Sequence, residues 1–225
     1  MIKVDTVYQR VLTLANKEQR GYITPQEFNL IAGQAQMEIF EQYFYDRKSE
    51  DKNVKNSTEF SNVDEMLEEK IAVFLKTATV PISGSVGNLP ADLYRLGQVE
   101  KNGIEVEQLN ANEVLYRLQS PISAPTIKFP AFIRKNNTQI TTFPAITNVK
   151  CNYIRAPKDP YWAYVVVLQD ALYNAPESVD FDLHKGDEAE LVYKILSLAG
   201  IVIAKPGLGT FADGQINTQK TQEKQ

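Results

Sequence analysis

The chain has little of the material from which disulfides, metal sites and acid–base pairs are made. Its 225 residues include one cysteine, Cys151, and one histidine, His184. A single cysteine excludes an intramolecular disulfide and a thiolate metal cluster. A single histidine excludes a two-histidine metal site or a catalytic histidine pair within one chain. We therefore expect a fold that depends on its apolar core, with no metal and no cofactor.

Long apolar runs and an excess of positive charge are also missing. No segment approaches the roughly 18 to 20 apolar residues that span a bilayer, and the N-terminus lacks the pattern of a signal peptide. The formal net charge is -4, whereas proteins that grip the nucleic acid backbone need a dense footprint of Lys and Arg. We expect no membrane partner, synthesis in a reducing cytoplasm, and no direct grip on DNA as the main task.

Helical periodicity dominates the first part of the chain, in which apolar residues recur at spacings of three and four. This spacing predicts a helix over about residues 3–17. A capping box at Thr24–Glu27, with proline at the first helical position, predicts a second helix from there to about residue 45. The two helices should form an αα-hairpin. Ser61 with Asp64 opens a third helix by the same capping logic.

The middle of the chain changes to prolines, glycines and short β-branched or aromatic runs, which predict strands divided by turns. Asn102-Gly103 is a strong hairpin signal because both residues tolerate positive φ. Asn110, with Glu113 three residues later, opens a short helix. The run Trp162–Tyr173 is ambiguous between a buried strand and a buried helix, and we favour a strand that gives way to a loop. The acidic start Asp187–Glu190 predicts a last helix.

These elements predict an α+β protein. Its helical body, the N-terminal αα-hairpin plus further helices, would carry an inserted small antiparallel β-sheet domain. The expected divisions are a helical region at 1–76 with a mobile loop at 46–60, the β domain at 77–160, a returning segment and helix at 161–204, and a flexible tail at 205–225. The loop and the tail bear too little apolar surface to offset their ordering entropy alone, so partner contacts would order them.

A calcium loop is the most tempting chemical motif, because Gly21 and Glu27 fall where an EF-hand places its turn glycine and bidentate ligand. The other ligands argue against it. Asn16 and Arg20 would occupy the first and fifth positions, and a cation at the fifth repels Ca²⁺. The capping box at Thr24–Glu27 already explains the same residues as a helix start.

Enzymatic motifs are equally weak. Cys151 alternates with polar residues as an inward strand residue does, and His184 lies in a polar turn, so a nucleophile pair is disfavoured. Gly207–Gly209 lacks the spacing of a phosphate-binding loop. The carboxylates at 65–69 and 188–190 suit a solvated helix face and a helix N-terminus. We predict a protein that is not an enzyme.

Aromatic residues are abundant, with 11 tyrosines and 10 phenylalanines. Four of them cluster at the end of the second predicted helix: Phe40, Tyr43, Phe44 and Tyr45. One side of a helix end can be buried within its own domain, so part of the cluster should face outward. Exposed aromatics are common interface anchors, which makes these four the candidate interface residues.

Several segments resemble, in the same order, virion structural proteins of crAss-like and related short-tailed phages. They are Val7–Val11 with Leu14–Asn29, Leu89–Arg95, Asn102-Gly103, Tyr153–Pro160 and Glu190–Leu196. The resemblance covers most of the chain, but it consists of caps and turns and includes no chemical signature.

That resemblance implies a head-to-tail connector or neck protein, bound near the portal in rings that are typically twelvefold around the DNA channel. Its partners would be copies of itself, the portal and other neck or tail proteins, while genomic DNA passes without sequence-specific binding. The chain would be made in the host bacterial cytoplasm and would end in the virion. The alternative is a phage-encoded nucleic-acid-binding or regulatory module, which salt-sensitive retention of DNA would favour.

Overall fold

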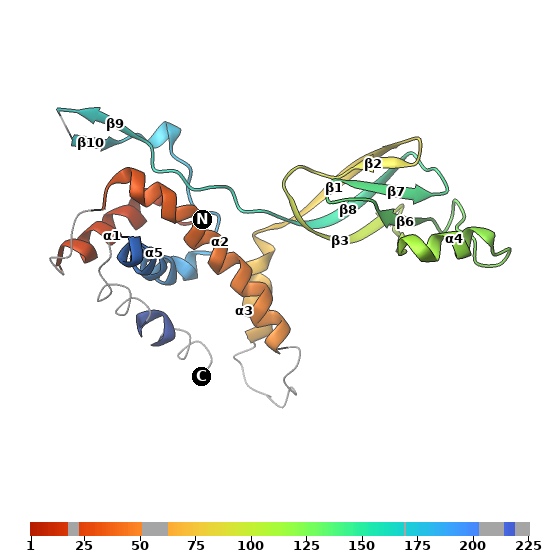
Figure 1. Ribbon diagram of the computed structural model, residues 1–225, viewed down its shortest axis with the longest axis horizontal. Coiled ribbons are helices and arrows are strands. Elements are labelled where there is room, and N and C mark those ends of the chain that lie inside the picture. The colour runs from red at the N-terminus through yellow and green to blue at the C-terminus, as the bar shows by residue number, and fades with distance from the viewer. Residues whose placement is uncertain (18–22, 51–62, 169, 203–213, 219–225) are drawn as a thin grey trace. The chain divides into compact units, whose positions relative to one another are not determined.

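The computed structural model describes residues 1–17, 23–50, 63–168, 170–202 and 214–218. The chain divides into two compact units. Residues 1–73 and 157–225 form the first, which we call the helical unit, and residues 74–156 form the second, the sheet unit. Figure 1 shows the elements of both. The sheet unit is inserted between α3 and the segment that follows residue 156.

The helical unit combines long helices with one small hairpin (Figure 1). Its elements are α1 (Val4–Lys17), α2 (Pro25–Glu50), α3 (Val63–Ala72), the strands β9 (Tyr164–Val167) and β10 (Asp170–Tyr173), the 3-10 turns η1 (Ala175–Glu177) and η2 (Lys185–Asp187), and α5 (Glu188–Val202). Residues 214–218 are also helical.

The predicted start of α2 is confirmed by its hydrogen bonds. The Thr24 N–H donates to Glu27 Oε2 over 2.8 Å, and the Glu27 N–H donates to Thr24 Oγ1 over 3.3 Å. These are the two reciprocal bonds of a capping box, which satisfy backbone groups that the first helical turn leaves without partners. The backbone N–H of Thr24 also holds the pKa of the Glu27 carboxyl below its ordinary value.

One predicted boundary in the helical unit is wrong. Helix α2 continues to Glu50, so residues 46–50 are helical and not part of a loop; residues 51–60 of the predicted mobile loop lie outside the described residues. In the flexible tail predicted from 205, residues 214–218 form a helical segment, and the flexibility of the tail stays a prediction. The rest of that tail lies outside the described residues.

Helix α5 is the centre of the helical unit because it packs against both α1 and α2. The apolar stripe predicted for the first helix is buried, as in Val4, Val7 and Val11, and Leu191 and Ile195 of α5 are fully buried. Removing such side chains from water is the main stabilising contribution of a core.

A buried charge also joins three elements of this unit. Asp187 is fully buried at the end of η2, and its Oδ1 lies 2.7 Å from Lys70 Nζ of α3. Its Oδ2 accepts a hydrogen bond of 2.6 Å from the Tyr43 hydroxyl of α2. The carboxylate is therefore held between a cation and a hydroxyl donor, which is the arrangement that makes a buried charge tolerable.

The sheet unit, which is described throughout, contains one eight-stranded sheet and a short helix. Its elements are β1 (Leu75–Ser83), β2 (Val86–Asn88), β3 (Leu93–Lys101), β4 (Ile104–Glu105), β5 (Glu107–Gln108), α4 (Ala111–Gln119), β6 (Ala131–Arg134), β7 (Gln139–Phe143) and β8 (Asn148–Arg155). Along the sheet they follow the order β4-β3-β8-β1-β2-β7-β6-β5.

The predicted fold class, a helical body with a small antiparallel insert, is wrong in its sheet. The sheet has eight strands, is mixed and is nearly closed like a barrel (Figure 1). Its parallel pair is β5 with β6, in which Glu107 lies opposite Ala131. A parallel pair needs a long crossover, and α4 with the chain that follows it supplies one. Strands of two residues give too little sequence pattern to predict this pairing.

One core lies inside the curled sheet. Its buried residues come from both halves of the strand order: Val80 from β1, Val99 from β3, Phe132 from β6, Ile140 from β7, and Val149, Cys151 and Tyr153 from β8. The alternation predicted for the last of these strands is confirmed, because Val149, Cys151 and Tyr153 are all buried. A sheet that closes on one core reduces its exposed edges.

Two turn signals in this unit are also confirmed. Asn102 and Gly103 both have positive φ, 52° and 79°, at the turn between β3 and β4. The capping box at Asn110 and Glu113 opens α4.

Gly97 was not singled out from the sequence, yet a Cβ there would lie 2.8 Å from the carbonyl oxygen of Asn152. It stands where the pairing of β3 with β8 shifts register, a common place for a close backbone approach.

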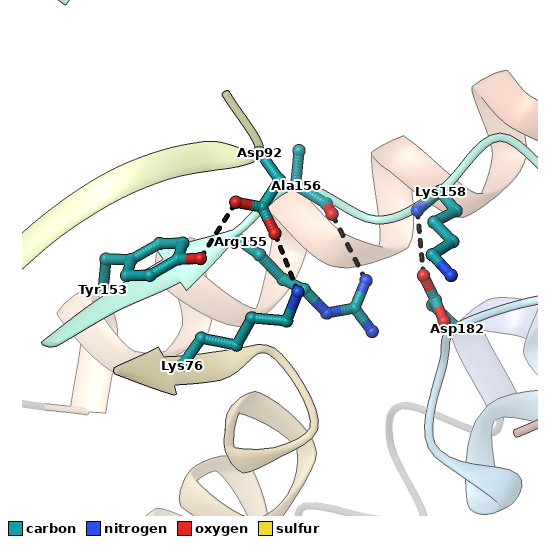
Figure 2. A network of polar contacts seen from close by, with 7 residues as sticks. All are labelled: Lys76, Asp92, Tyr153, Arg155, Ala156, Lys158 and Asp182. Carbon is teal, nitrogen blue, oxygen red and sulfur yellow. Dashed lines mark hydrogen bonds and ion pairs between the residues drawn. The ribbon is translucent and has the colours of Figure 1, made fainter. Parts of the chain in front are cut away.

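A polar network joins the ends of the strands where the chain enters and leaves the sheet unit (Figure 2). The Asp92 carboxylate accepts hydrogen bonds from Lys76 Nζ, over 2.8 Å, and from the Tyr153 hydroxyl, over 2.9 Å. The bond from Lys76 holds the pKa of Asp92 below its ordinary value. Burial and the Asp92 carboxylate together raise the pKa of Tyr153 to about 12. The Arg155 guanidinium lies 5.4 Å from the centre of the Phe74 ring.

We expect the sheet unit to lose stability between about pH 10 and 12 because of Tyr153. The pKa of a tyrosine is about 10 in the unfolded chain, whereas the pKa of Tyr153 in the folded protein is about 12. The contribution of Tyr153 to the stability of the folded state is therefore complete below about pH 10 and is lost as the pH rises through about 12. The loss should be up to about 3 kcal/mol, since each pKa unit corresponds to about 1.4 kcal/mol. Urea unfolding of wild type and Tyr153→Phe, followed by circular dichroism from pH 8 to 12, measures it. The stability difference between the two proteins should change with pH, and parallel curves would contradict the prediction.

Candidate interaction surface

The four predicted interface aromatics are divided by burial. Phe40 and Tyr43 belong to the core of the helical unit, with Tyr43 bonded to Asp187. Phe44 is half-buried, with its ring edge-on to Phe40 at 5.1 Å between centroids. Tyr45 is 70% exposed. The interface role of the cluster stays a prediction, and at the surface it now rests on Tyr45 and the exposed part of Phe44.

A stronger candidate is the β9–β10 hairpin of the helical unit. Its apolar side chains are exposed along both strands and at the turn: Val165, Val166, Val167, Leu168 and Leu172. Leu168, at the turn with φ of 50°, is 93% exposed. Side chains alternate between the two faces of a strand. Consecutive exposed valines therefore mean that the hairpin is apolar on both faces.

The base of this hairpin is fixed by aromatic packing. Trp162, just before β9, is buried, and its ring stacks on Tyr164 and Tyr173, which lie opposite each other in the two strands. The Trp162 ring also packs on Tyr8 of α1, with centroids 4.4 Å apart. A two-stranded hairpin is marginal by itself in water, and packing against a core makes it persist.

Hydrogen bonds reinforce the same base. Trp162 Nε1 donates to Asp5 Oδ1 over 3.0 Å. The Trp162 backbone and the Asn29 side chain exchange two bonds, from Trp162 N to Asn29 Oδ1 and from Asn29 Nδ2 to Trp162 O. The hairpin is thus a projection with a rigid base and exposed apolar strands, a form that contacts a partner with little ordering cost.

Only part of this surface could be predicted from the sequence. The strand expected over the start of Trp162–Tyr173 is confirmed as β9, but a second strand follows where we expected a loop. The burial expected for the run is wrong except near its base. A continuous apolar run has the same sequence pattern whether its own chain or another molecule covers it.

A second apolar surface lies on the sheet unit, around α4 and the chain that follows it. Val114 turns inward from α4, while Leu115 and Tyr116 are exposed. Ile122 and Phe129, further along, are exposed as well, Ile122 by 96%. Exposed apolar groups gathered in one stretch of a folded unit are typical of contact sites.

The helical unit also has a groove between α1 and α5, with a volume of about 600 Å³. Leu14, Ala189, Val192 and Tyr193 contribute apolar and aromatic surface to it. Thr6, Gln9 and Thr13 add polar groups, together with the charged Asp5 and Arg10. An apolar lining with a few polar groups is the usual composition of a binding site.

Cys151 and His184, which were considered above as a nucleophile pair, both have contacts that belong to the fold. Cys151 is buried in β8 with its Sγ 3.5 Å from the Ala78 carbonyl oxygen, and burial raises the pKa of this thiol. His184 precedes η2, where its Nδ1 accepts from the Gly186 N–H. The two belong to different units. Gly207–Gly209 and residues 18–22 of the calcium-loop candidate fall outside the described residues.

Within the described ranges, no group of three or more His, Cys, Asp or Glu side chains is placed to hold a metal ion. The same part of the chain has no helix with the length and apolar character needed to cross a membrane. Neither protein-family models nor curated proteins match this chain. The interpretation of its function therefore depends on its own surfaces and on the resemblance noted in its sequence.

Proposed function

We propose that this chain is a non-catalytic structural subunit of a tailed-phage virion, a ring-forming head-to-tail connector or neck protein that joins portal and tail around the DNA channel. The order of segments that resemble neck proteins of crAss-like and related short-tailed phages supports the class. By the same resemblance the ring would be twelvefold, and the protein would be found in the virion after synthesis in the host cytoplasm.

The observation that supports an assembly role most is the β9–β10 hairpin. Its valines and Leu168 are exposed, while its base packs against the buried ring of Trp162. Free monomers rarely keep a contiguous apolar surface in water unless it serves binding. A rigid apolar projection gains stability when a partner covers it, which favours a subunit that acts by contact.

The charged groups discussed above also suit a structural subunit. Asp187 holds together helices of its own unit, Asp92 joins strand ends, and Glu27 caps a helix. Each carboxylate therefore has a role within the fold. The net charge of -4 suits a channel through which DNA passes without sequence-specific binding.

Two separate apolar surfaces would let one subunit contact two kinds of neighbour. The hairpin belongs to the helical unit and the α4 surface to the sheet unit. In a neck, a subunit meets copies of itself sideways and other proteins, such as the portal or tail proteins, above and below.

Electron microscopy and native mass spectrometry of the purified full chain test this function, over a concentration series and after mixing with the portal protein of its phage. We expect closed rings of one size. Monomers under all these conditions would overturn the proposal. Salt-sensitive retention on DNA-cellulose by such monomers would favour the nucleic-acid-binding alternative.

A further inference from the structure

The charge of the chain is divided unevenly between its two units. Residues 74–156, the sheet unit, contain nine Lys or Arg and five Asp or Glu, a net charge of +4. The remainder of the chain therefore carries a net charge of -8. Within the sheet unit, residues 114–156 contain six Lys or Arg and no Asp or Glu. A basic unit in an acidic chain indicates that this unit has a negatively charged partner.

The turn between β6 and β7 carries two of these cations to the surface (Figure 1). All five of its residues, which we call the basic turn, are exposed: Arg134, Lys135, Asn136, Asn137 and Thr138. None of the five is apolar. Lys128, in the chain before β6, is exposed as well, with its Nζ 5.3 Å from the centre of the Phe129 ring.

Hydrogen bonds fix the backbone of the basic turn. Asn136 Oδ1 accepts from the N–H and the hydroxyl of Thr138, over 2.9 and 3.0 Å. The Lys135 N–H donates to the Gln139 carbonyl oxygen over 3.0 Å. Arg134 Nε donates to the Asn136 carbonyl oxygen over 3.3 Å and keeps its other N–H donors for a partner. The turn therefore presents its cations at a low cost in ordering.

The carboxylates of the sheet unit have partners of their own or lie on other strands. They are Asp92, Glu100, Glu105, Glu107 and Glu113. Asp92 and Glu107 form ion pairs, Glu113 caps α4, and the other two lie opposite each other in β3 and β4. Among the described residues, by contrast, Lys128, Arg134 and Lys135 form no ion pair. Their charges can therefore meet an external anion.

A phosphate backbone fits the basic turn better than a protein surface does. Protein interfaces have apolar or aromatic anchors at their centre, and the basic turn has none. Phosphate oxygens accept hydrogen bonds from Arg and Lys and from amide and hydroxyl groups, which are the side chains of this turn. Duplex DNA carries about one negative charge per 1.7 Å of its axis, so separate cations on one surface can each meet a phosphate.

We propose that the basic turn, together with Lys128, contacts the phosphate backbone of duplex DNA without reading its sequence. The inference rests on the function proposed above, because it names the part of the subunit that meets the DNA in the channel. The acidic remainder of the chain repels DNA, whereas the sheet unit attracts it. The few phosphate contacts of one copy are weak alone, and they add up when the copies of a ring engage one duplex.

Salt-dependent binding of the full chain to duplex DNA tests this contact. Fluorescence anisotropy follows two short labelled duplexes of unrelated sequence, at salt concentrations from roughly 50 to 200 mM. We expect equal affinity for both duplexes and a steep loss of affinity as salt rises. Arg134→Gln combined with Lys135→Gln should weaken binding at least about tenfold at the lowest salt. It should also reduce the slope of log K against log salt by about 2 for each engaged copy.

Two control variants separate local charge from net charge and from folding. Arg47→Gln combined with Lys185→Gln removes the same charge from exposed positions of the helical unit. It should leave the affinity and its salt slope unchanged. Arg134→Lys combined with Lys135→Arg keeps both cations on the basic turn and should retain the binding. Circular dichroism of all three double variants should match that of the wild type.

The outcomes distinguish this contact from the proposed function. Rings without salt-dependent affinity for duplex DNA, or a Gln double variant that binds as wild type does, would overturn the contact and leave the function standing. If the Gln double variant bound DNA normally but no longer formed rings, the basic turn would meet an acidic protein surface instead, which also overturns the contact. Monomers whose DNA binding is lost in the Gln double variant would support the contact and overturn the ring-forming function.

Discussion

Replacing Asp187 with alanine should lower the free energy of unfolding of the helical unit by about 3 kcal/mol. The substitution removes a fully buried carboxylate that lies 2.7 Å from Lys70 Nζ and accepts from the Tyr43 hydroxyl. Lys70 keeps its charge with a side chain only 13% exposed. The cost of holding that charge away from water then opposes folding, which is why removing one member of a buried pair destabilises strongly.

The single tryptophan makes this effect measurable in the correct unit. Trp162 lies in the helical unit, so its fluorescence during urea unfolding reports on that unit. Lys70→Met provides the control, because it removes the cation and keeps most of the apolar stem. In the double variant Asp187→Ala with Lys70→Met, the loss should be smaller than the sum of the single losses. Additive losses would show that the ion pair has no energetic coupling.

Trp162→Ala should destabilise the helical unit by about 3 to 5 kcal/mol and abolish ring formation. The first effect follows from the loss of a large buried ring that packs on Tyr8, Tyr164 and Tyr173. The second follows because the hairpin is marginal without that packing, so its strands would lose their fixed geometry. Unfolding followed by far-ultraviolet circular dichroism gives the first quantity, and native mass spectrometry gives the second.

Two variants separate stability from assembly. Trp162→Phe keeps an aromatic ring but loses the hydrogen bond to Asp5, so it should cost less and still form rings. Leu168→Ser changes an exposed turn residue and should leave the unfolding free energy within about 0.5 kcal/mol while it weakens assembly. If Leu168→Ser assembles as wild type does, the hairpin turn is not part of the contact.

Local features of the fold could be predicted because their causes lie within a few residues. The Thr24 capping box, the Asn102-Gly103 turn and the Asn110 box each depend on side chains three or fewer positions from the backbone they affect. The buried alternation of β8 likewise follows from the two-residue period of a strand. Each of these features is confirmed at its predicted position.

The candidate interface could be predicted only in part. The aromatic cluster at the end of α2 was visible in the sequence, but burial of Phe40 and Tyr43 against distant elements was not. The sequence showed that the valine run of β9 is apolar, but it did not show that these side chains are exposed. Whether an apolar side chain is covered depends on which other segments come near it, and a one-dimensional pattern does not contain that information.

The sequence by itself determined that the chain begins in helices, continues in strands and lacks the cysteines and histidines of common catalytic and metal sites. Tertiary structure alone decided that the sheet curls into one mixed, nearly closed barrel, that Tyr43 meets Asp187 across 144 positions, and that the β9–β10 hairpin stands exposed on a tryptophan base. The physical reason is the distance along the sequence between the residues that interact. Caps and turns are set by neighbouring residues, whereas pairing, burial and exposure are set by segments that only the folded chain brings together.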